Sequence, residues 1–305
     1  MKVLVTGGAG YKGVVLSQAL LREQHKVTIA DNFMNGYDSV LHLATNENLN
    51  VLKVDVRSIA QQQLSQFDVI YHLAAIVGMP ACAANQYGAQ SVNADATKRL
   101  VKLLHQDQRL IYASTTSFYG DSGKTCDEET PVNPLSIYGK TKYEAERYVL
   151  ERENSISLRF ATVFGVSPHM RTDLLVNDFT YRACKEKVVV VYSGDSKRTF
   201  LHIEDTIAGY LFAMQNFGKM KSRIFNVGDE SLNLSKIDVA HAIKRYVDYE
   251  FINASMKDVD VRNFEISFSR IKNLGFTVRR NIDDGVKEMA RLFQYYDSTN
   301  PFRVF

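Results

Sequence analysis

Residues 3–13 read VLVTGGAGYKG, and this stretch decides the fold. The apolar run Val3-Leu4-Val5 ends at glycines, so we expect a short buried strand followed by a tight turn. Apolar residues then recur at helical spacing up to Leu21, and a second apolar run ends at Asp31. Strand, glycine-rich turn, helix, strand and acid in this order indicate a unit that binds a dinucleotide.

Each glycine has a distinct role in such a turn. Gly7 permits the sharp bend, Gly10 lets the backbone approach a pyrophosphate, and Gly13 lets the helix pack close to the strand. The free N–H groups at the start of the helix favour the phosphates. Asp31 accepts hydrogen bonds from ribose hydroxyls and repels a 2′-phosphate, which favours NAD over NADP. The spacing is GxxGxxG rather than GxGxxG, and the alternative is a tight turn without a ligand.

Lys12 stands where an apolar residue is expected. It adds positive charge near the phosphates, or it points to solvent; we favour solvent.

The size and the cysteines of the chain describe an ordinary globular protein. Of its 305 residues, 45% are apolar and 23% are charged. This length allows one large domain or two modest ones, with a core that needs no disulfide. The cysteines are odd in number and form no CxxC motif, which indicates a reducing compartment. They are Cys82, Cys126 and Cys184.

Charge and hydropathy argue against two classes of partner. The net charge of +3, from 37 basic and 34 acidic residues, gives no broad positive field, so we expect neither a nucleic-acid nor a membrane partner. We find no apolar run of about 18 residues and no signal peptide at the N-terminus. A cytoplasmic protein is therefore expected.

The rest of the first half alternates strands with helices, which predicts βαβ units on a parallel sheet. We expect an α/β fold, namely a Rossmann-type doubly wound parallel sheet with a smaller C-terminal α/β region that binds substrate. The expected strands are Val51–Asp55, Asp68–Ala75, Leu110–Ser114 and Ile156–Phe160, and the helices are Ala89–His105 and Ile137–Glu151.

The pattern changes after about Gly165. We expect residues 1–165 to bind the dinucleotide, residues 166–305 mainly to bind substrate, and segments near 195–228 to return to the first domain. The expected elements are helices at Leu174–Lys185, Thr206–Gln215 and Ser235–Val247, strands at Val188–Tyr192, Arg223–Val227 and near Phe251, and two more helices.

Tyr138 and Lys142 stand four residues apart in an expected helix, so they share one face. A cationic lysine there favours the phenolate and lowers the pKa of the tyrosine toward working pH. The alternative is an ordinary exposed pair. Hydroxyl residues cluster in Ser114–Gly120, at the end of a strand of the expected sheet. They lie near the cofactor, or they only make turn hydrogen bonds.

Together these features resemble the extended short-chain dehydrogenase/reductases, in the branch of the nucleotide-sugar epimerases and dehydratases. The resemblance runs from Met1 to about Asp284. Its segments are Thr6–Gly13, Asp31–Asn32, Val54–Val56, His72–Ala75, Asn93, Ser114–Gly120, Tyr138 with Lys142, Arg159–Phe160, Leu174–Phe179, Arg198–Asp205 and Val261–Arg262.

The resemblance implies NAD as the cofactor, with Asp31 and Asn32 at the adenosine ribose and Asp55 and Val56 at the adenine. The whole implied NAD-binding set is Gly7, Gly10, Tyr11, Lys12, Gly13, Asp31, Asn32, Asp55, Val56, Leu73, Ala74, Ala75, Asn93, Tyr138 and Lys142.

The resemblance also implies the catalytic residues and a nucleotide-diphosphate sugar as substrate. Tyr138 takes the proton from a sugar hydroxyl, Lys142 binds the nicotinamide ribose, and Thr115 hydrogen-bonds the reacting oxygen. The substrate-binding residues are Thr116, Asn177, Arg198 and Arg262. Arginine forks suit phosphate oxygens, although arginines often form only surface ion pairs. No metal is expected.

The implied reaction is NAD-dependent oxidation at C4 of the sugar to a 4-keto intermediate. Dehydratases of this branch have Asp-Glu after the catalytic threonine, whereas this chain has Thr116 and Ser117, which cannot do that acid–base work. Neither residue is the cysteine of the fucose-synthase type. A 4-epimerase, a 4-dehydrogenase and a 4-keto reductase remain; a silent NAD-binding regulator and a reductase of non-sugar carbonyls are less favoured.

Residues 161–179 resemble more narrowly a subgroup from bacterial surface-polysaccharide gene sets that includes the capsular GDP-heptose 4-dehydrogenases. Arg171 in this segment contacts substrate, or it is a solvated loop residue. The helices Ala89–His105 and Ile137–Glu151 match the pair that forms a four-helix bundle in dimers of this branch. We therefore expect a homodimer, with a monomer whose helices are solvated as the alternative.

Overall fold

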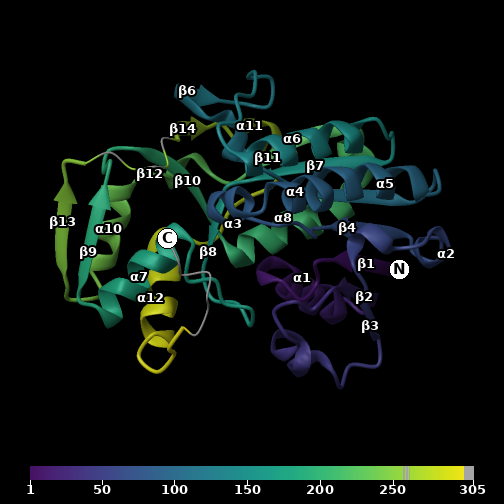
Figure 1. Ribbon diagram of the computed structural model, residues 1–305, viewed down its shortest axis with the longest axis horizontal. Coiled ribbons are helices and arrows are strands. Elements are labelled where there is room, and N and C mark those ends of the chain that lie inside the picture. The colour runs from purple at the N-terminus through teal and green to yellow at the C-terminus, as the bar shows by residue number, and fades with distance from the viewer. Residues whose placement is uncertain (257, 259, 261, 299–305) are drawn as a thin grey trace. The chain divides into compact units, whose positions relative to one another are not determined.

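A seven-stranded sheet forms the centre of the N-terminal part in the computed structural model, which describes residues 1–256, 258, 260 and 262–298 (Figure 1). The strand order is β11-β7-β5-β4-β1-β2-β3. The bounds are β1 (Lys2–Thr6), β2 (Lys26–Asp31), β3 (Leu49–Lys53), β4 (Val69–His72), β5 (Arg109–Thr115), β7 (Ser155–Phe160) and β11 (Arg223–Val227). The expected doubly wound sheet is confirmed.

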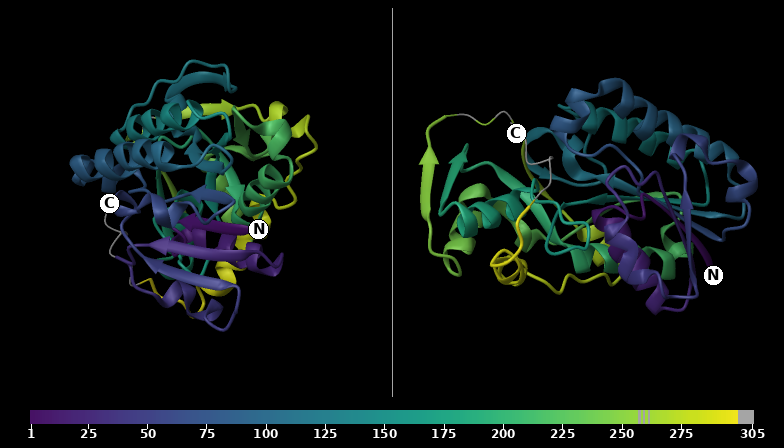
Figure 2. Two further views of the ribbon diagram at one scale, coloured as in Figure 1. Left: turned by 90° about the vertical axis from the view of Figure 1, so that its right-hand side faces the viewer. Right: turned by 60° about the horizontal axis from the view of Figure 1, so that its bottom comes forward.

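The strand order reverses at β1, which pairs in parallel with β2 on one side and with β4 on the other. In open α/β sheets, ligands bind beyond the carboxyl ends of the strands at such a reversal. The glycine-rich turn leaves β1 at this edge, and residues 73–78 leave β4 beside it. The views of Figure 2 show the purple N-terminal strands lying along one another.

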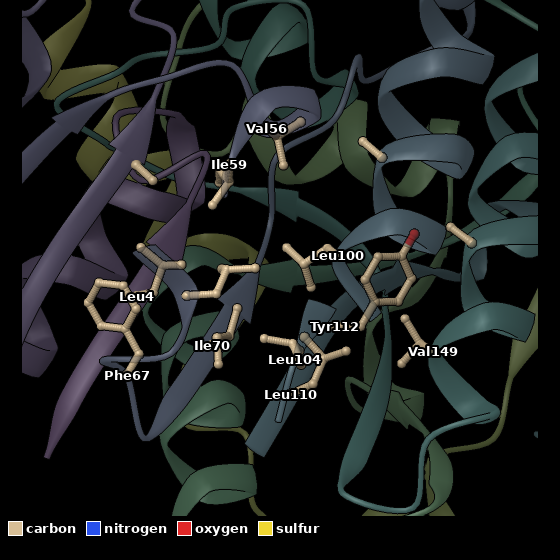
Figure 3. Close-up of a cluster of buried hydrophobic side chains, with 14 residues drawn as sticks. Leu4, Val56, Ile59, Phe67, Ile70, Leu100, Leu104, Leu110, Tyr112 and Val149 are labelled. Carbon is tan, nitrogen blue, oxygen red and sulfur yellow. The ribbon is translucent and has the colours of Figure 1, made fainter. Parts of the chain in front are cut away.

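Alternate side chains of the central strands face opposite sides of the sheet. Leu4, Ile70 and Leu110 join one core, which Leu100 of α5 (Ala96–Leu103) and Val149 of α6 (Ile137–Leu150) cover (Figure 3). Tyr71 follows Ile70 on β4, and its hydroxyl donates to the backbone carbonyl of Tyr210 on α8 (Ile203–Gln215), at 3.3 Å. The sheet therefore has helices on both faces, as the strand–helix alternation predicts.

The helix expected over Ala89–His105 is built from three pieces. It consists of α4 (Gln86–Ala89), a π-helical segment η3 (Gln90–Asp95) and α5. Segments of π-helix are rare and often stand at functional sites. Asn93, an expected site residue, lies within this one.

Two compact units divide the described chain, and neither is one continuous stretch. The first unit contains Met1–Phe118, Pro134–Arg159 and Ile207–Phe225. The second contains Tyr119–Asn133, Phe160–Thr206 and the chain from Asn226 onward. Residues 207–225 belong to the first unit and include the first three residues of β11, an edge strand of the large sheet. The assignment of one region to NAD and the other to substrate stays a prediction.

The second unit contains three small sheets. Their strand orders are β12-β10-β8, β13-β9 and β14-β6. The right-hand view of Figure 2 shows β9 and β13 side by side, in parallel register. The strand bounds are β6 (Asp121–Cys126), β8 (Thr162–Phe164), β9 (Val188–Tyr192), β10 (Lys197–His202), β12 (Asn233–Ser235), β13 (Glu250–Ala254) and β14 (Asn263–Ile266). The sequence did not predict β6, β8, β10, β12 and β14: β8 and β12 have three residues and β14 four, β6 contains one apolar residue, and β10 begins with two cations.

The helices of the second unit agree with the sequence pattern to within a few residues. The three long ones are α7 (Leu175–Lys185), α10 (Lys236–Lys244) and α12 (Ile282–Leu292). The remaining elements of the chain are α1 (Tyr11–Arg22), η1 (Asp38–Leu43), η2 (Val56–Ser58), α2 (Gln61–Leu64), α3 (Met79–Ala84), η4 (Thr116–Tyr119), α9 (Phe217–Met220), η5 (Glu230–Leu232) and α11 (Ser269–Lys272). Among the helices of the described residues, none combines the length and the apolar character that a membrane span requires.

Candidate active site

The glycine-rich turn forms a close-fitting backbone cradle at the edge of the sheet. Gly7 has a φ of +70°, and a Cβ there would lie 2.8 Å from the backbone nitrogen of Ala74. A Cβ on Gly13 would lie 2.1 Å from the carbonyl oxygen of Gly7. Gly10 precedes α1 in an extended conformation and without a side-chain cap, and the first turn of α1 contains no acid. An uncapped helix start without an acid favours an anion, which fits a dinucleotide pyrophosphate.

Asp31, at the end of β2, is tied to this cradle. Its carboxylate accepts hydrogen bonds from the backbone N–H of Ala9 at 3.1 Å and of Phe33 at 3.0 Å. The neighbouring Asn32 is exposed and accepts from the backbone N–H of Met34 at 3.1 Å. The structure thus brings the acid predicted for the ribose to the glycine turn.

The two residues predicted for the adenine have different surroundings. The side chain of Asp55 accepts from Arg57 Nε at 2.9 Å and Nη2 at 2.6 Å, which holds the pKa of Asp55 below its usual value. Val56 is buried and belongs to the core below the sheet edge. Its side chain therefore packs in the hydrophobic core.

Asn93 holds the segment that follows β4. Its amide oxygen accepts from the backbone N–H of Ile76 at 2.8 Å, and its amide nitrogen donates to the carbonyl of Ile76 at 2.9 Å. The same nitrogen donates to Thr141 Oγ1 on α6 at 3.1 Å. Asn93 therefore positions residues 73–76 against the helix that carries Tyr138 and Lys142.

His72, the last residue of β4, is fully buried, and the sequence alone predicted no role for it. Its ring nitrogens lie 2.7 Å from Thr6 Oγ1 and 2.8 Å from Thr97 Oγ1. Burial, together with the charge of Lys142, lowers the pKa of His72 to about 3, so the ring is neutral. Its neutral ring links β1 to α5, and a histidine inside an apolar strand was the signal that could have found it.

Cys82 on α3 also lies beside this network. Its Sγ donates to the carbonyl of Ile76 at 3.3 Å and lies 4.0 Å from Asn93 Nδ2. Burial raises the pKa of this thiol to about 11, so it is not a reactive thiolate.

Tyr138 and Lys142 lie one turn apart in α6, whose N-cap Ser136 accepts from the backbone N–H of Gly139. Tyr138 is half-buried, whereas Lys142 is only 2% exposed, with its Nζ 4.1 Å from the ring centroid of Tyr112. Burial and the positive charge of Lys12 hold the pKa of Lys142 well below its usual value. The reading of this pair as an ordinary exposed one is therefore wrong.

Thr115 and Thr116 are buried where β5 ends and η4 begins. Thr115 Oγ1 donates to Ser117 Oγ at 2.9 Å and accepts from the backbone N–H of Ser117 at 3.1 Å. These hydroxyls thus make turn hydrogen bonds in the same unit as Tyr138 and Lys142.

Lys12 does not simply point to solvent. It is half-buried, and its Nζ lies 5.9 Å from the ring centroid of Tyr210. Lys12 is therefore partly exposed, and its place near the phosphates stays a prediction.

The predicted phosphate-binding arginines meet at one carboxylate in the second unit. Arg198 is 2% exposed, and its Nη2 lies 3.1 Å from Asp260 Oδ1. Arg262 Nε donates to Asp260 Oδ1 at 2.8 Å. Burial alone would raise the pKa of Asp260, but the two guanidinium groups hold it well below the usual range. Val261, part of the same resemblance, lies outside the described residues.

Asn177 is fully buried, and its side chain hydrogen-bonds backbone groups of the protein. It donates to the carbonyl of Arg171 at 2.8 Å and accepts from the backbone N–H of Gly165 at 3.1 Å. The side chain of Arg171 donates through Nε to Asp173 at 3.0 Å. Arg171 is therefore ion-paired within its loop rather than simply solvated.

The profile of the NAD dependent epimerase/dehydratase family matches residues 3–228. The chain belongs to this family. The family is NAD-dependent, and the glycine cradle at the start of α1 fits that cofactor.

Three proteins illustrate the likeness. UDP-glucuronic acid decarboxylase 1 of Xenopus tropicalis is 26% identical, over 99% of this chain and 77% of the relative. The uncharacterized UDP-glucose epimerase YtcB of Bacillus subtilis (strain 168) is 32% identical, over 68% of this chain and 71% of the relative. The solved structure of MoeE5 in complex with UDP-glucuronic acid and NAD is 25% identical with a TM-score of 0.82, over 96% of this chain and 99% of that one.

Proposed function

We propose that this protein is an NAD-dependent epimerase that inverts C4 of a UDP-sugar through a 4-keto intermediate. Two of the three proteins above are named for UDP-sugar chemistry, and the third binds UDP-glucuronic acid. None of these three acts on a GDP-heptose by its name, so the narrower resemblance to GDP-heptose dehydrogenases receives no support from them. A 4-dehydrogenase and a 4-keto reductase share the same first-step residues and are distinguished by experiment.

The chemistry divides between an alcohol proton and a carbon-bound hydride. Tyr138, as the phenolate, accepts the proton of the C4 hydroxyl while the C4–H bond breaks. Bound NAD supplies the hydride acceptor. Thr115 hydrogen-bonds the reacting oxygen, and Lys142 binds the nicotinamide ribose beside Tyr138. Rotation of the keto sugar and return of hydride to the opposite face, with Tyr138 returning the proton, complete the inversion.

The observation that carries an epimerase rather than a dehydratase is the pair of residues after Thr115. Thr116 is buried at the start of η4, and Ser117 hydrogen-bonds Thr115. Neither side chain can take the C5 proton or protonate a leaving C6 hydroxyl at neutral pH. The machinery beside Thr115 therefore suits hydride transfer without elimination.

Decarboxylation is the second candidate, because a relative covering nearly the whole chain is a UDP-glucuronic acid decarboxylase. A 4-keto group next to C5 activates a C5 carboxylate toward loss of CO₂, so this reaction needs the same first step. The sugar decides between the two reactions: a carboxylate at C5 is required for decarboxylation.

The nucleotide is proposed to bind through its diphosphate. Arg198 and Arg262 both present guanidinium groups at Asp260, and two such forks match diphosphate oxygens. Asn177 fixes the loop of Arg171 and Gly165 near the start of α7. We propose these residues as the substrate-binding set, together with Thr116.

A homodimer and a cytoplasmic location are also proposed. The outer faces of α5 and α6 carry Lys98, Lys102 and Arg147, which are exposed, and Lys98 Nζ lies 4.8 Å from the ring centroid of Tyr148. A second copy could pair with these two helices. Light scattering should give twice the mass of the chain, and a monomer mass would contradict the dimer.

A panel of nucleotide sugars tests the proposed function. Purified protein with NAD is incubated with UDP-glucose, UDP-N-acetylglucosamine, UDP-glucuronic acid and their GDP, CDP and dTDP counterparts, and products are identified by NMR. A C4 epimer without net NADH supports the epimerase, whereas CO₂ from UDP-glucuronic acid alone identifies the decarboxylase. A keto product with one NADH per sugar identifies a dehydrogenase. No reaction with any UDP-sugar overturns the proposal.

A further inference from the structure

Arg198, one of the two arginines proposed for the diphosphate, is covered by Asp260. Its Nη2 donates to the backbone carbonyl of Asp260 at 3.1 Å and lies 3.1 Å from Oδ1 of the same residue. Its Nη1 donates to the carbonyl of Lys197 at 3.0 Å. The side chain of Arg198 is 2% exposed, whereas that of Asp260 is 23% exposed. A ligand that arrives from solvent therefore meets Asp260 before it reaches the guanidinium of Arg198.

Arg262 donates to the same carboxylate from the other side of the segment. Its Nε lies 2.8 Å from Asp260 Oδ1, and its Nη2 lies 2.5 Å from Oδ2, so one guanidinium edge faces both carboxylate oxygens. The side chain of Arg262 is 25% exposed. Phosphate oxygens accept hydrogen bonds from arginine in this same forked arrangement. The carboxylate of Asp260 thus uses donors that a diphosphate needs.

Asp258, two residues earlier, is paired with a different buried cation. Its carboxylate contacts Nζ of Lys236, the first residue of α10, and its backbone N–H donates to Ser193 Oγ at 2.9 Å. Lys236 is 2% exposed, and its Nζ also donates to the carbonyl of Tyr192 at 2.9 Å. The chain at Asp258 is therefore anchored without the two arginines, so the side chain of Asp260 can turn away while this anchor holds.

We propose that Asp260 is a competing anion that sets the specificity of the diphosphate site: its carboxylate holds Arg198 and Arg262, and the diphosphate of the substrate replaces it. A diphosphate brings two negative charges and oxygens on two phosphorus atoms, whereas Asp260 brings one charge and two oxygens. The affinity is then the difference between two sets of ion pairs, and a ligand with a single carboxylate gains nothing by the exchange. That the diphosphate belongs to a nucleotide sugar rests on the proposed function.

The test measures the Kd for UDP and the Kd for inorganic pyrophosphate by isothermal titration calorimetry. It uses the full chain saturated with NAD, so that the glycine cradle is occupied and no sugar is needed. Asp260→Asn keeps the shape of the side chain and removes its charge, so both Kd values should fall by about 10-fold. If Asp260 instead orders the arginines for the ligand, the same variant weakens binding. An unchanged or higher Kd therefore overturns the proposal.

Asp258→Asn is the matched control, because it removes an acid from the same segment and breaks a pair with a buried cation other than the two arginines. It should change both Kd values far less than Asp260→Asn does. An equal gain in the two variants would mean that a loosened segment tightens binding, and it would overturn the proposal. Asp260→Ser provides a second neutral variant if Asp260→Asn fails to fold, as judged by circular dichroism.

A double-mutant cycle with Arg198→Gln tests whether the gain comes from the release of Arg198. Arg198→Gln alone should raise the Kd for UDP. In this background Asp260→Asn should improve binding much less than it does in the wild type, because one of the two guanidinium groups is gone. A full gain without Arg198 overturns the claim that Asp260 keeps this arginine from the ligand.

The outcome is independent of the proposed reaction. If the sugar panel fails but UDP and pyrophosphate bind more tightly to Asp260→Asn, the competition by Asp260 stands and the epimerase does not. If UDP-sugars are epimerised but the Kd for UDP does not fall in Asp260→Asn, the epimerase stands and the competition does not.

Discussion

Lys142 of the first unit and Arg198 of the second are both almost fully buried, but their charges are stabilised in different ways. Lys142 is packed against Tyr112, and burial together with Lys12 lowers its pKa. Burial also lowers the pKa of Arg198, but Arg198 is paired with Asp260, and the pKa of that carboxyl is held well below its usual range. A lysine can give up its proton when desolvated, whereas a guanidinium stays charged and needs a counterion. The first region is therefore suited to chemistry that moves protons, and the second to holding an anion in place.

Tyr138→Phe tests whether the first unit carries out the proton transfer. Removal of the phenol removes the group that exchanges the proton with the sugar, so kcat should fall by about 10²- to 10⁴-fold. The fold and NAD binding should be kept, as measured by thermal unfolding and dinucleotide affinity. Tyr143→Phe, on the same helix, is the control. Turnover within a few-fold of wild type would remove Tyr138 from the mechanism.

Glu146→Gln tests a buried ion pair of the first unit, between Arg159 and Glu146, which resembles the Arg198–Asp260 pair of the second unit. Arg159 and Glu146 are almost fully buried and joined at 2.6 Å. Loss of one partner leaves a buried charge without compensation, so the free energy of unfolding in urea should fall by about 3–5 kcal/mol. Glu153→Gln, which breaks an exposed pair with Lys221, should lower this free energy far less. Equal losses in both variants would contradict the contrast.

Acid should destabilise the first region through His72. Its pKa is about 3 in the folded protein and near 6.5 when exposed, so the unfolded state binds one more proton between these values. The contribution of His72 to stability is thus complete above about pH 6.5 and is lost as the pH falls toward 3, at up to about 1.4 kcal/mol per pH unit. The free energy of unfolding is measured against pH. His72→Asn should flatten its slope between about pH 3 and 6.5, whereas the control His42→Gln, at an exposed histidine, should not. A slope in His72→Asn equal to that of the wild type would exclude His72 as its source.

Arg198→Lys tests whether the second unit holds the anionic substrate, and its expected effect is the smallest. A lysine keeps the charge beside Asp260 but loses the planar fork, so KM for the nucleotide sugar should rise about tenfold with kcat little changed. Steady-state kinetics with the substrate found in the panel measure this split. Arg245→Lys, at an exposed pair with Asp283, is the control. A fall in kcat at constant KM would place Arg198 in catalysis instead.

The fold was largely predictable because its signals are local. The glycine turn, α1 and Asp31 lie within about 30 consecutive residues, and the i, i+4 spacing of Tyr138 and Lys142 needs only a helix. Five strands of the second unit were not predicted. β6 has a mostly polar sequence and β14 has only four residues, so each depends on its pairing with the other, which local sequence does not reveal.

The sequence alone determined which residue types stand at the cofactor edge: glycines, an acid, a hydroxyl, a tyrosine and a lysine at fixed spacing. Only the tertiary structure decided how charged and polar those groups are. Lys142 loses its hydration, and His72 becomes neutral between two threonines. Asp260 joins Arg198 to Arg262 across more than sixty residues of chain. Charge state depends on burial and on neighbours distant in sequence, and neither is encoded in local spacing.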